Sequence, residues 1–438
     1  MAVSQQKAAS IFANSLRTRT AVLVSLVTLA GVLTMASTGH AQTLTVLHTF
    51  SGPDGANPIA GLTIDSGGNL YGTTGFGGNT GGPCQRTGCG TVFKLTHFGS
   101  GWVLSTLLRF NGQNGGDGLV PMGTVSFGPD GALYGTTSCC SGGTVFRLQP
   151  SAHRCASRSC PWTETVINRF GYSNGSIPIG DLAFDGGGNL YGTTSSGGNY
   201  QRCGGLGCGE VYQLVRSGGT WTENVLYEFL NGADGEYPNS GVTVDQAGNI
   251  YGTAPQDGNA FGLVFELAPS GSGWNFNAVY RFQNGADGEH PWGGLVLGGS
   301  GSLYGTTTVG GLGGGGTVFQ LARSGNDWSF DLLYGLTGNN SNLDGPWGKL
   351  IMDTAGNVYG TSLKNGAFGY GNVFRLSPSM GSWTYTSLHD FTGGSDGASP
   401  YGGLVVDSSG NLYGTAMSGG NAGPCDTGYC GVIWEITP

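Results

Sequence analysis

Seven variants of one short motif, Gly-Asn-Leu-Tyr-Gly-Thr, run through the chain and constrain its fold more than any other feature. Their tyrosines are Tyr71, Tyr134, Tyr191, Tyr251, Tyr304, Tyr359 and Tyr413. The intervals average 57 residues, so seven units need 399 residues, and residues 43–438 number 396. Repeats of this length are typical of arrays in which each unit buries its faces against its neighbours. The repeats therefore occupy all of residues 43–438 and leave no room for a second domain.

Each unit carries four strand signals, which we call a, b, c and d. In the first unit these are residues 61–65, 69–74, 90–95 and 103–110. Their β-branched and aromatic residues lie between Gly, Asn and Ser, and no window has a sustained helical period. The 88 glycines fit the many tight turns that short strands need. Four antiparallel strands in each of seven units predict an all-β fold, a seven-bladed β-propeller.

The two ends of the array predict how the ring closes. A tryptophan opens strand d in six units, at Trp102, Trp162, Trp221, Trp274, Trp328 and Trp383. The seventh unit lacks it, but residues 44–50 form a d-type strand ahead of the first unit, and residues 431–436 form a c-type strand. Pairing of 44–50 with 431–436 would complete the seventh blade and remove both open edges.

The first 42 residues resemble a secretory signal peptide. Lys7, Arg17 and Arg19 precede an apolar run at 21–36, and Gly39 and Ala41 are small residues suited to cleavage after Ala41. An uncleaved membrane anchor is the alternative, but about 16 apolar residues fall short of the roughly 20 that a spanning helix needs. We therefore expect a bacterial protein that is secreted, periplasmic or on the cell surface, without membrane insertion after cleavage.

The predicted mature chain, residues 43–438, is acidic. It has 14 Lys and Arg against 26 Asp and Glu, a net charge of −12. Such a surface argues against nucleic acid and anionic membranes as partners, and it is compatible with neutral glycans, cations or basic peptides. We expect a monomer that needs no cofactor, with calcium as the one ion to consider.

All ten cysteines lie in the predicted mature chain, and eight of them form four C-x4-C pairs. Close pairs in an exported chain predict the local disulfides Cys84–Cys89, Cys155–Cys160, Cys203–Cys208 and Cys425–Cys430. Cys139 and Cys140 are adjacent, and the sequence leaves open whether they bond to each other. Zinc is the alternative for the pairs, but their spacing is not C-x2-C and exported thiols oxidise.

The repeated pattern D-x-x-G-N-L-Y-G-T-T, followed by G-T-V-F-x-L, resembles the bacterial Gloeo/Verruco, or GloVer, tandem-repeat family. The resemblance covers residues 44–438 and is specific because the pattern recurs seven times in register. It implies an exported protein of propeller-like repeats and brings no catalytic residue with it. The second and fifth copies depart from the pattern, with Gly128 and Gly298 in place of aspartate.

Two sets of acidic residues recur around the ring. The first set ends strand a before a turn, where we expect each carboxylate to accept backbone N–H groups. It comprises Asp65, Asp185, Asp245, Asp353 and Asp407. The second set lies in D-G segments between strands d and a, with Asn174 in the third copy. These residues either form turns or bind calcium, and the calcium candidates are Asp234, Glu236, Asp287 and Glu289.

Antiparallel strands place the b–c and d–a loops on one face of the ring, which we call the loop face. Three of the C-x4-C pairs lie in b–c loops, and loops on a rigid scaffold commonly carry function. The residue after the loop proline is aromatic in the last three copies, at Trp292, Trp347 and Tyr401. These residues open strand a at the predicted channel mouth, where they either stack on sugar rings or pack blade against blade.

Catalytic signatures are sparse. No H-E-x-x-H, G-x-S-x-G or Walker pattern occurs, and His48 and His389 hold equivalent positions in strand d. We therefore predict an exported, non-enzymatic propeller that binds a glycan or another surface macromolecule through the loop face. One alternative is a lyase or hydrolase of polysaccharide or a small substrate, with His290 beside Glu289 and Asp287. The other is an adhesion or structural module of the cell surface.

Overall fold

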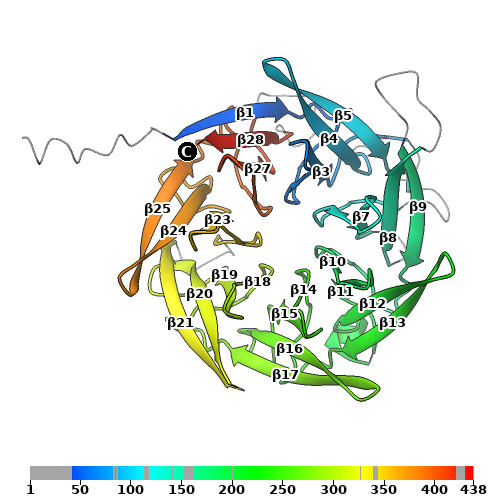
Figure 1. The fold of residues 1–438 in the computed structure, drawn as a ribbon, viewed down its shortest axis with the longest axis vertical. Coiled ribbons are helices and arrows are strands. Elements are labelled where there is room, and N and C mark those ends of the chain that lie inside the picture. Colours follow the sequence, from blue (N-terminus) through cyan, green and yellow to red (C-terminus); the bar gives the residue numbers. More distant parts are fainter. Residues whose placement is uncertain are drawn as a thin grey trace, which may run out of the picture. The chain divides into compact units, whose positions relative to one another are not determined.

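Seven four-stranded sheets stand around a central axis and form a seven-bladed β-propeller, which confirms the predicted fold (Figure 1). The computed structural model describes residues 42–81, 84, 87–112, 118–139, 142–151, 162–199, 201–325, 327–338, 344–420 and 430–437. We number the blades by their motif tyrosines, from blade 1 with Tyr71 to blade 7 with Tyr413. The predicted signal peptide lies outside the described residues except for Gln42, and it stays a prediction.

The innermost strands, a, are β2 (Thr63–Ile64), β6 (Ser126–Phe127), β10 (Ala183–Phe184), β14 (Thr243–Val244), β18 (Val296–Leu297), β22 (Ile351–Met352) and β26 (Val405–Val406). Each has two residues, fewer than the five predicted. The preceding residues contact the next blade instead of strand b. In blade 1, for example, the Gly61 backbone N–H donates to Thr124 Oγ1 of blade 2, with a nitrogen–oxygen distance of 3.2 Å.

The second strands, b, are β3 (Leu70–Thr74), β7 (Leu133–Thr137), β11 (Leu190–Thr194), β15 (Ile250–Ala254), β19 (Leu303–Thr307), β23 (Val358–Ser362) and β27 (Leu412–Ala416). The third strands, c, are β4 (Thr91–Phe98), β8 (Thr144–Pro150), β12 (Glu210–Ser217), β16 (Leu263–Ser270), β20 (Gly314–Ser324), β24 (Asn372–Ser379) and β28 (Val432–Thr437). The outer strands, d, are β5 (Gly101–Arg109), β9 (Trp162–Arg169), β13 (Thr220–Glu228), β17 (Gly273–Arg281), β21 (Asp327–Thr337), β25 (Ser382–Asp390) and, for blade 7, β1 (Thr43–Thr49). The 3₁₀ turn η2 (Cys203–Gly205) lies in the b–c loop of blade 3, and no helix of the described residues is long and apolar enough to cross a membrane.

The repeated glycine of strand b makes room for an aromatic ring of strand c. Gly72 pairs with Phe93 across β3 and β4. A Cβ atom on Gly72 would lie 2.6 Å from Phe93 Cζ, which is closer than real Cβ contacts come. The Tyr-Gly-Thr motif therefore keeps glycine where the ring crosses the strand.

The motif tyrosine links a turn to the neighbouring blade. In blade 1, Asp65 Oδ1 accepts the backbone N–H groups of Gly67 and Asn69, and Tyr71 donates its hydroxyl to Asp65 Oδ2 at 3.0 Å. The ring of Tyr71 packs edge-on against Trp162 of blade 2, with centroids 6.3 Å apart. The predicted turn-capping role of the strand-a aspartates is confirmed. In blade 2, where Gly128 replaces aspartate, Asp130 accepts the Tyr134 hydroxyl instead.

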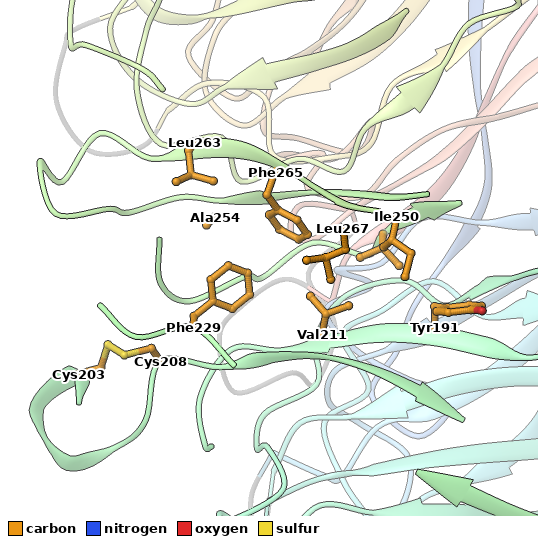
Figure 2. Close-up of a cluster of buried hydrophobic side chains, with 11 residues drawn as sticks. Tyr191, Cys203, Cys208, Val211, Phe229, Ile250, Ala254, Leu263, Phe265 and Leu267 are labelled. Atoms are coloured by element: carbon orange, nitrogen blue, oxygen red, sulfur yellow. A yellow bond between two sulfur atoms is a disulfide. The ribbon is translucent and has the colours of Figure 1, made fainter. Parts of the chain in front are cut away.

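The core lies between the blades. The buried hydrophobic side chains of the described residues form seven clusters, and each cluster is shared by two neighbouring blades. In the cluster between blades 3 and 4, Phe229 and Val211 face Phe265 and Leu267 (Figure 2). A blade that buries its faces in this way depends on both of its neighbours.

The ring closes as predicted, between the first and the last strand. β1 is hydrogen-bonded to β28 and forms the outer strand of blade 7 (Figure 1). The Phe50 backbone N–H donates to the Gly431 carbonyl at 3.1 Å, and the fully buried Phe50 ring lies 5.3 Å from that of Phe93 in blade 1. The observed strands, 43–49 and 432–437, differ from the predicted ones by one residue.

Candidate functional site

The b–c and d–a loops lie together on the loop face, because they pair within each blade. In blade 1 an antiparallel bridge joins Ala56 to Phe76, and in blade 3 one joins Ser176 to Ser196. The mouth of the central channel on this face is lined by the seven residues that follow the loop prolines, which we call the mouth ring. They are Ile59, Met122, Ile179, Asn239, Trp292, Trp347 and Tyr401. The cavity that they enclose is partly open to solvent and has a volume of about 100 Å³.

Two residues further along the chain, a second ring lines the same cavity, and we call it the inner ring. It consists of Gly61, Thr124, Asp181, Gly241, Gly294, Lys349 and Gly403. Asp181 and Lys349 are the only charged residues among the described lining. Both also line the next cavity along the channel, so they stand where the two cavities meet.

Lys349 reaches from blade 6 along the channel wall to blade 4. Its stem lies against Gly294 of blade 5, where a Cβ atom would be 3.4 Å from Lys349 Cδ. Its ammonium group donates to Thr243 Oγ1 over 3.4 Å. Burial lowers the pKa of Lys349, and the negative charge of Asp181 partly opposes this shift. The glycines of the inner ring thus leave the space through which a long basic side chain extends.

Asp181 of blade 3 is held by blade 2. Its Oδ1 atom accepts the Thr124 backbone N–H at 2.7 Å, while its Oδ2 atom meets no donor among the described residues. No ion pair joins Asp181 to Lys349 in the described part of the chain, although the two charges influence each other. The channel wall therefore carries both a carboxylate and an ammonium group.

The three predicted aromatic residues come together at the mouth. The rings of Trp292 and Trp347 stack with centroids 4.7 Å apart and planes inclined by 24°, and Trp347 and Tyr401 lie 4.9 Å apart at 33°. Because Trp347 lies between the other two, both of its faces contact protein. The stack runs along the mouth ring from blade 5 to blade 7. Of the two alternatives, sugar stacking and blade-to-blade packing, the second therefore accounts for Trp347. Trp292 ends the stack on the side of blade 4, whose mouth residue is Asn239.

The residues of the enzyme alternative do not line the channel. His290 Nδ1 bonds the Pro255 carbonyl oxygen at 2.9 Å, and its backbone N–H donates to Phe261 of the preceding blade. Glu289 pairs through its backbone with Val309. Asp287 accepts the Tyr280 hydroxyl and the backbone N–H of Gln283. These contacts serve the scaffold and give the alternative no geometric support.

The calcium candidates also make loop contacts. Asp234 accepts the Leu230 backbone N–H and the Tyr227 hydroxyl, as Asp287 does one blade further on. Within the described residues, one group of three Cys, His, Asp or Glu ligands is close enough to share an ion, and it consists of Cys203, Cys208 and Glu236. The two sulfurs of that group are bonded to each other. The four predicted residues are not gathered into such a group, and calcium in these loops stays a prediction.

Two predicted disulfides, Cys84–Cys89 and Cys203–Cys208, are present. Cys430 is disulfide-bonded, and its expected partner Cys425 lies outside the described residues, as do Cys155 and Cys160. Cys139 carries a free, exposed thiol, and Cys140 lies outside the described residues.

Asp181 and Lys349 were missed by sequence reasoning. The signal was present in the repeats: three residues after the loop proline, five copies have glycine or threonine, and copies three and six have Asp and Lys. An alignment of the seven copies by this column would have found both. Their proximity across the channel follows only from ring closure, which brings blades 3 and 6 to one axis.

The chain is thus a seven-bladed β-propeller, and its candidate site lies in the central channel. The profile of the Gloeobacter/Verrucomicrobia repeat matches residues 29–202, 143–341 and 259–438, and the chain belongs to that family. No curated protein matches the sequence.

Three solved structures are similar to this chain at low identity, each with a TM-score below 0.5. A candidate 6-phosphogluconolactonase from Bacteroides uniformis has a TM-score of 0.49 and 13% identity, over 81% of this chain and 89% of that one. A candidate oxidoreductase (glucose dehydrogenase) from Thermus thermophilus has a TM-score of 0.42 and 14% identity, over 72% and 95%. A luciferin-regenerating enzyme has a TM-score of 0.42 and 10% identity, over 91% and 95%.

Proposed function

We propose that the chain is an exported, non-enzymatic binding propeller that captures carbohydrate at the loop-face mouth of its channel. One observation carries the proposal: an aromatic face, an amide, a carboxylate and an ammonium group converge on blades 3 to 5. Asn239 and Trp292 belong to the mouth ring, and Asp181 and the Lys349 ammonium lie just inside. Binding sites for small polar ligands combine apolar lining with a few polar groups in this way.

The aromatic part of the site suits the C–H face of a sugar ring. Trp347 lies between its two neighbours, so a ligand would stack on one end of the row, and Trp292 is the end next to Asn239. Aromatic surfaces supply large apolar contact area at little cost in conformational entropy, and the rigid stack holds Trp292 in place.

The charged part of the site suits hydroxyl groups. Asp181 Oδ2 can accept an O–H, and the Lys349 ammonium can donate to the oxygen of a neighbouring hydroxyl. Two vicinal hydroxyls would satisfy both groups at once, and each hydrogen bond to an ionised group contributes about 1.5–3 kcal/mol.

Glycan-array screening followed by titration calorimetry tests the proposal. We expect Trp292→Ala and Asp181→Asn each to weaken binding about tenfold or more, because each removes roughly 1.4 kcal/mol or more of contact energy. Phe368→Ala is the matched control, since Phe368 is an aromatic residue that is 59% exposed in a b–c loop away from the channel. Wild-type affinity in both site variants, or no retained glycan with the wild-type chain, would contradict the proposal.

We also propose export through cleavage of the signal peptide after Ala41, and a monomeric mature chain. The two disulfides support an oxidising compartment such as the periplasm, the cell surface or the medium. N-terminal sequencing of the protein from the exporting cell would test the cleavage site after Ala41.

A further inference from the structure

The last residue of strand b lies opposite the first residue of strand c in most blades. The two residues of this buried pair are normally either both polar and hydrogen-bonded to each other, or both apolar. In blades 1, 2 and 5 two threonines share a hydrogen bond, with oxygen–oxygen distances of 2.9, 2.7 and 2.8 Å for Thr74–Thr91, Thr137–Thr144 and Thr307–Thr317. In blade 6, Ser362 donates to Asn372. Blades 4 and 7 have the apolar pairs Ala254–Leu263 and Ala416–Val432.

Blade 3 breaks this rule. There Thr194 lies opposite Glu210, and both residues are fully buried. Glu210 Oε1, Glu210 Oε2 and Thr194 Oγ1 have no hydrogen-bond partner among the described residues. Three unpaired oxygen atoms at one strand end are unusual, because buried polar atoms normally have partners.

These oxygens are directed into a shared space. A Cβ atom on Gly175 would lie 2.5 Å from Glu210 Oε1 and 2.6 Å from Thr194 Oγ1, so both oxygens face the same point of the Gly175 backbone. A Cβ atom on Gly198 would lie 3.6 Å from Glu210 Oε2 and 3.8 Å from the carboxyl carbon of Glu228. Glycine at position 175 lets the two oxygens approach the backbone this closely, as Gly118 and Gly288 do for the threonines of blades 2 and 5.

Among the described residues, the charges that act on Glu210 are those of Glu223 and Glu228, and both are negative. Its cross-strand partner on strand d is Glu228, whereas blades 1, 2 and 4 have Arg109, Arg169 and Arg281 at that position. Like charges directly opposite each other destabilise a sheet. Burial, followed by the charges of Glu223 and Glu228, raises the pKa of Glu210 to about 8. The arrangement therefore lacks a positive charge.

We propose that Glu210, Glu228 and Thr194 bind a calcium ion at the loop-face end of blade 3. Carboxylate and hydroxyl oxygens are the hard ligands that Ca²⁺ prefers, and two carboxylates balance its charge. The buried, unpaired hydroxyl of Thr194 distinguishes this site from an ordinary surface cluster of acids. Glu228 is exposed, so the ion can enter from solvent. The site is separate from the d–a loop acids Asp234, Glu236, Asp287 and Glu289.

Calorimetric titration of the chelator-stripped full chain with CaCl₂ at pH 8 tests this site. We expect one saturable Ca²⁺ site and a rise in Tm with Ca²⁺. Glu210→Thr recreates the threonine pair of blades 1, 2 and 5, and we expect it to abolish both effects while it folds normally. Glu228→Gln should weaken binding at least tenfold. Glu289→Gln, which removes a carboxylate of the other candidate set, is the matched control and should bind as the wild type does.

Two results would overturn the proposal. One is a wild-type chain that takes up no Ca²⁺ at millimolar concentration, which would leave Glu210 as a protonated or hydrated buried acid. The other is Ca²⁺ binding that survives Glu210→Thr and is lost in Glu289→Gln, which would assign the ion to the d–a loops. Terbium luminescence excited through tyrosine gives an independent readout, since Tyr212 lies on the same strand as Glu210.

Discussion

At the residue scale, the carboxylates of the ring fall into two kinds. Burial would raise the pKa of Asp65, but hydrogen bonds from Asn69, Tyr71 and Gly67 outweigh it and lower the pKa below 3.8. Asp185, Asp353 and Asp407 behave in the same way. These groups stabilise the fold as anions, and their contribution is lost as pH falls through their folded-state pKa values. Glu210 is of the opposite kind, since its folded-state pKa is raised.

Glu210 predicts a pH dependence in chelator. Between about 4.5 and about 8 the folded chain keeps a proton on Glu210 that the unfolded chain has released. The free energy of unfolding should therefore decrease as pH rises through this window, by up to about 1.4 kcal/mol per pH unit, and level off above it. Urea denaturation at pH 5, 6.5 and 8 measures the slope. Glu210→Thr should remove this decrease, and an equal slope in both proteins would contradict the assignment.

At the element scale, the cysteine-bearing loops end where the next blade attaches. The carbonyl oxygens of Cys89, Cys208 and Cys430 accept backbone N–H groups of the following d–a loop, from Val120 at 3.0 Å and from Tyr237 and Asn57 at 2.9 Å. Each described disulfide joins residues five apart and so fixes the end of a loop that carries an inter-blade hydrogen bond. The Cys203–Cys208 pair also packs beside Phe229 in the cluster between blades 3 and 4 (Figure 2).

Removal of the Cys203–Cys208 disulfide should lower the free energy of unfolding by a measurable amount. For Cys203→Ser/Cys208→Ser we expect the free energy of unfolding to fall by about 2 kcal/mol, the loop-entropy value for a six-residue loop. Guanidinium denaturation checks the value, and Cys139→Ser is the control because that thiol is free and exposed. A double variant as stable as the wild type would mean that the loop keeps its conformation without the bond.

The four strands of each unit, the number of blades and the closure of the ring were predictable from the sequence. Each of these features rests on a motif that is repeated in register. The length of strand a was not, because residues such as Gly61 bond to the next blade and not to their own sheet. The aromatic members of the mouth ring were predictable from the column after the loop proline, but their mutual stacking depends on the angle between blades. Lys349 was missed because its ammonium crosses two blade boundaries to reach Thr243, which no local pattern encodes.

At the scale of the whole molecule, stability depends on a closed circle of seven inter-blade clusters. Deletion of residues 43–50 removes β1 and Phe50 and leaves β28 as an open edge. We expect a lower Tm and association into oligomers, because an unpaired edge strand invites pairing with other chains. Size-exclusion chromatography with light scattering measures the association.

A circular permutant is the control for this deletion. It joins residue 437 to residue 43 through a short Gly-Ser linker and opens the chain at 271–272, in the turn between β16 and β17. It keeps every strand pair and should be monomeric, with a Tm close to that of the wild type. A deletion variant that stays monomeric with an unchanged Tm would show that closure by β1 adds little.

The pairing of β1 with β28 also has a consequence for protein synthesis. The ribosome makes β1 before any other strand of the ring, whereas its partner β28 emerges last. Blades 1 to 6 can form in order as the chain lengthens, each against the one before it. Throughout that time β1 has no partner, and blade 1 has one face uncovered. The outer position of blade 7 can therefore be filled, and the ring closed, only after β28 is available to pair with β1.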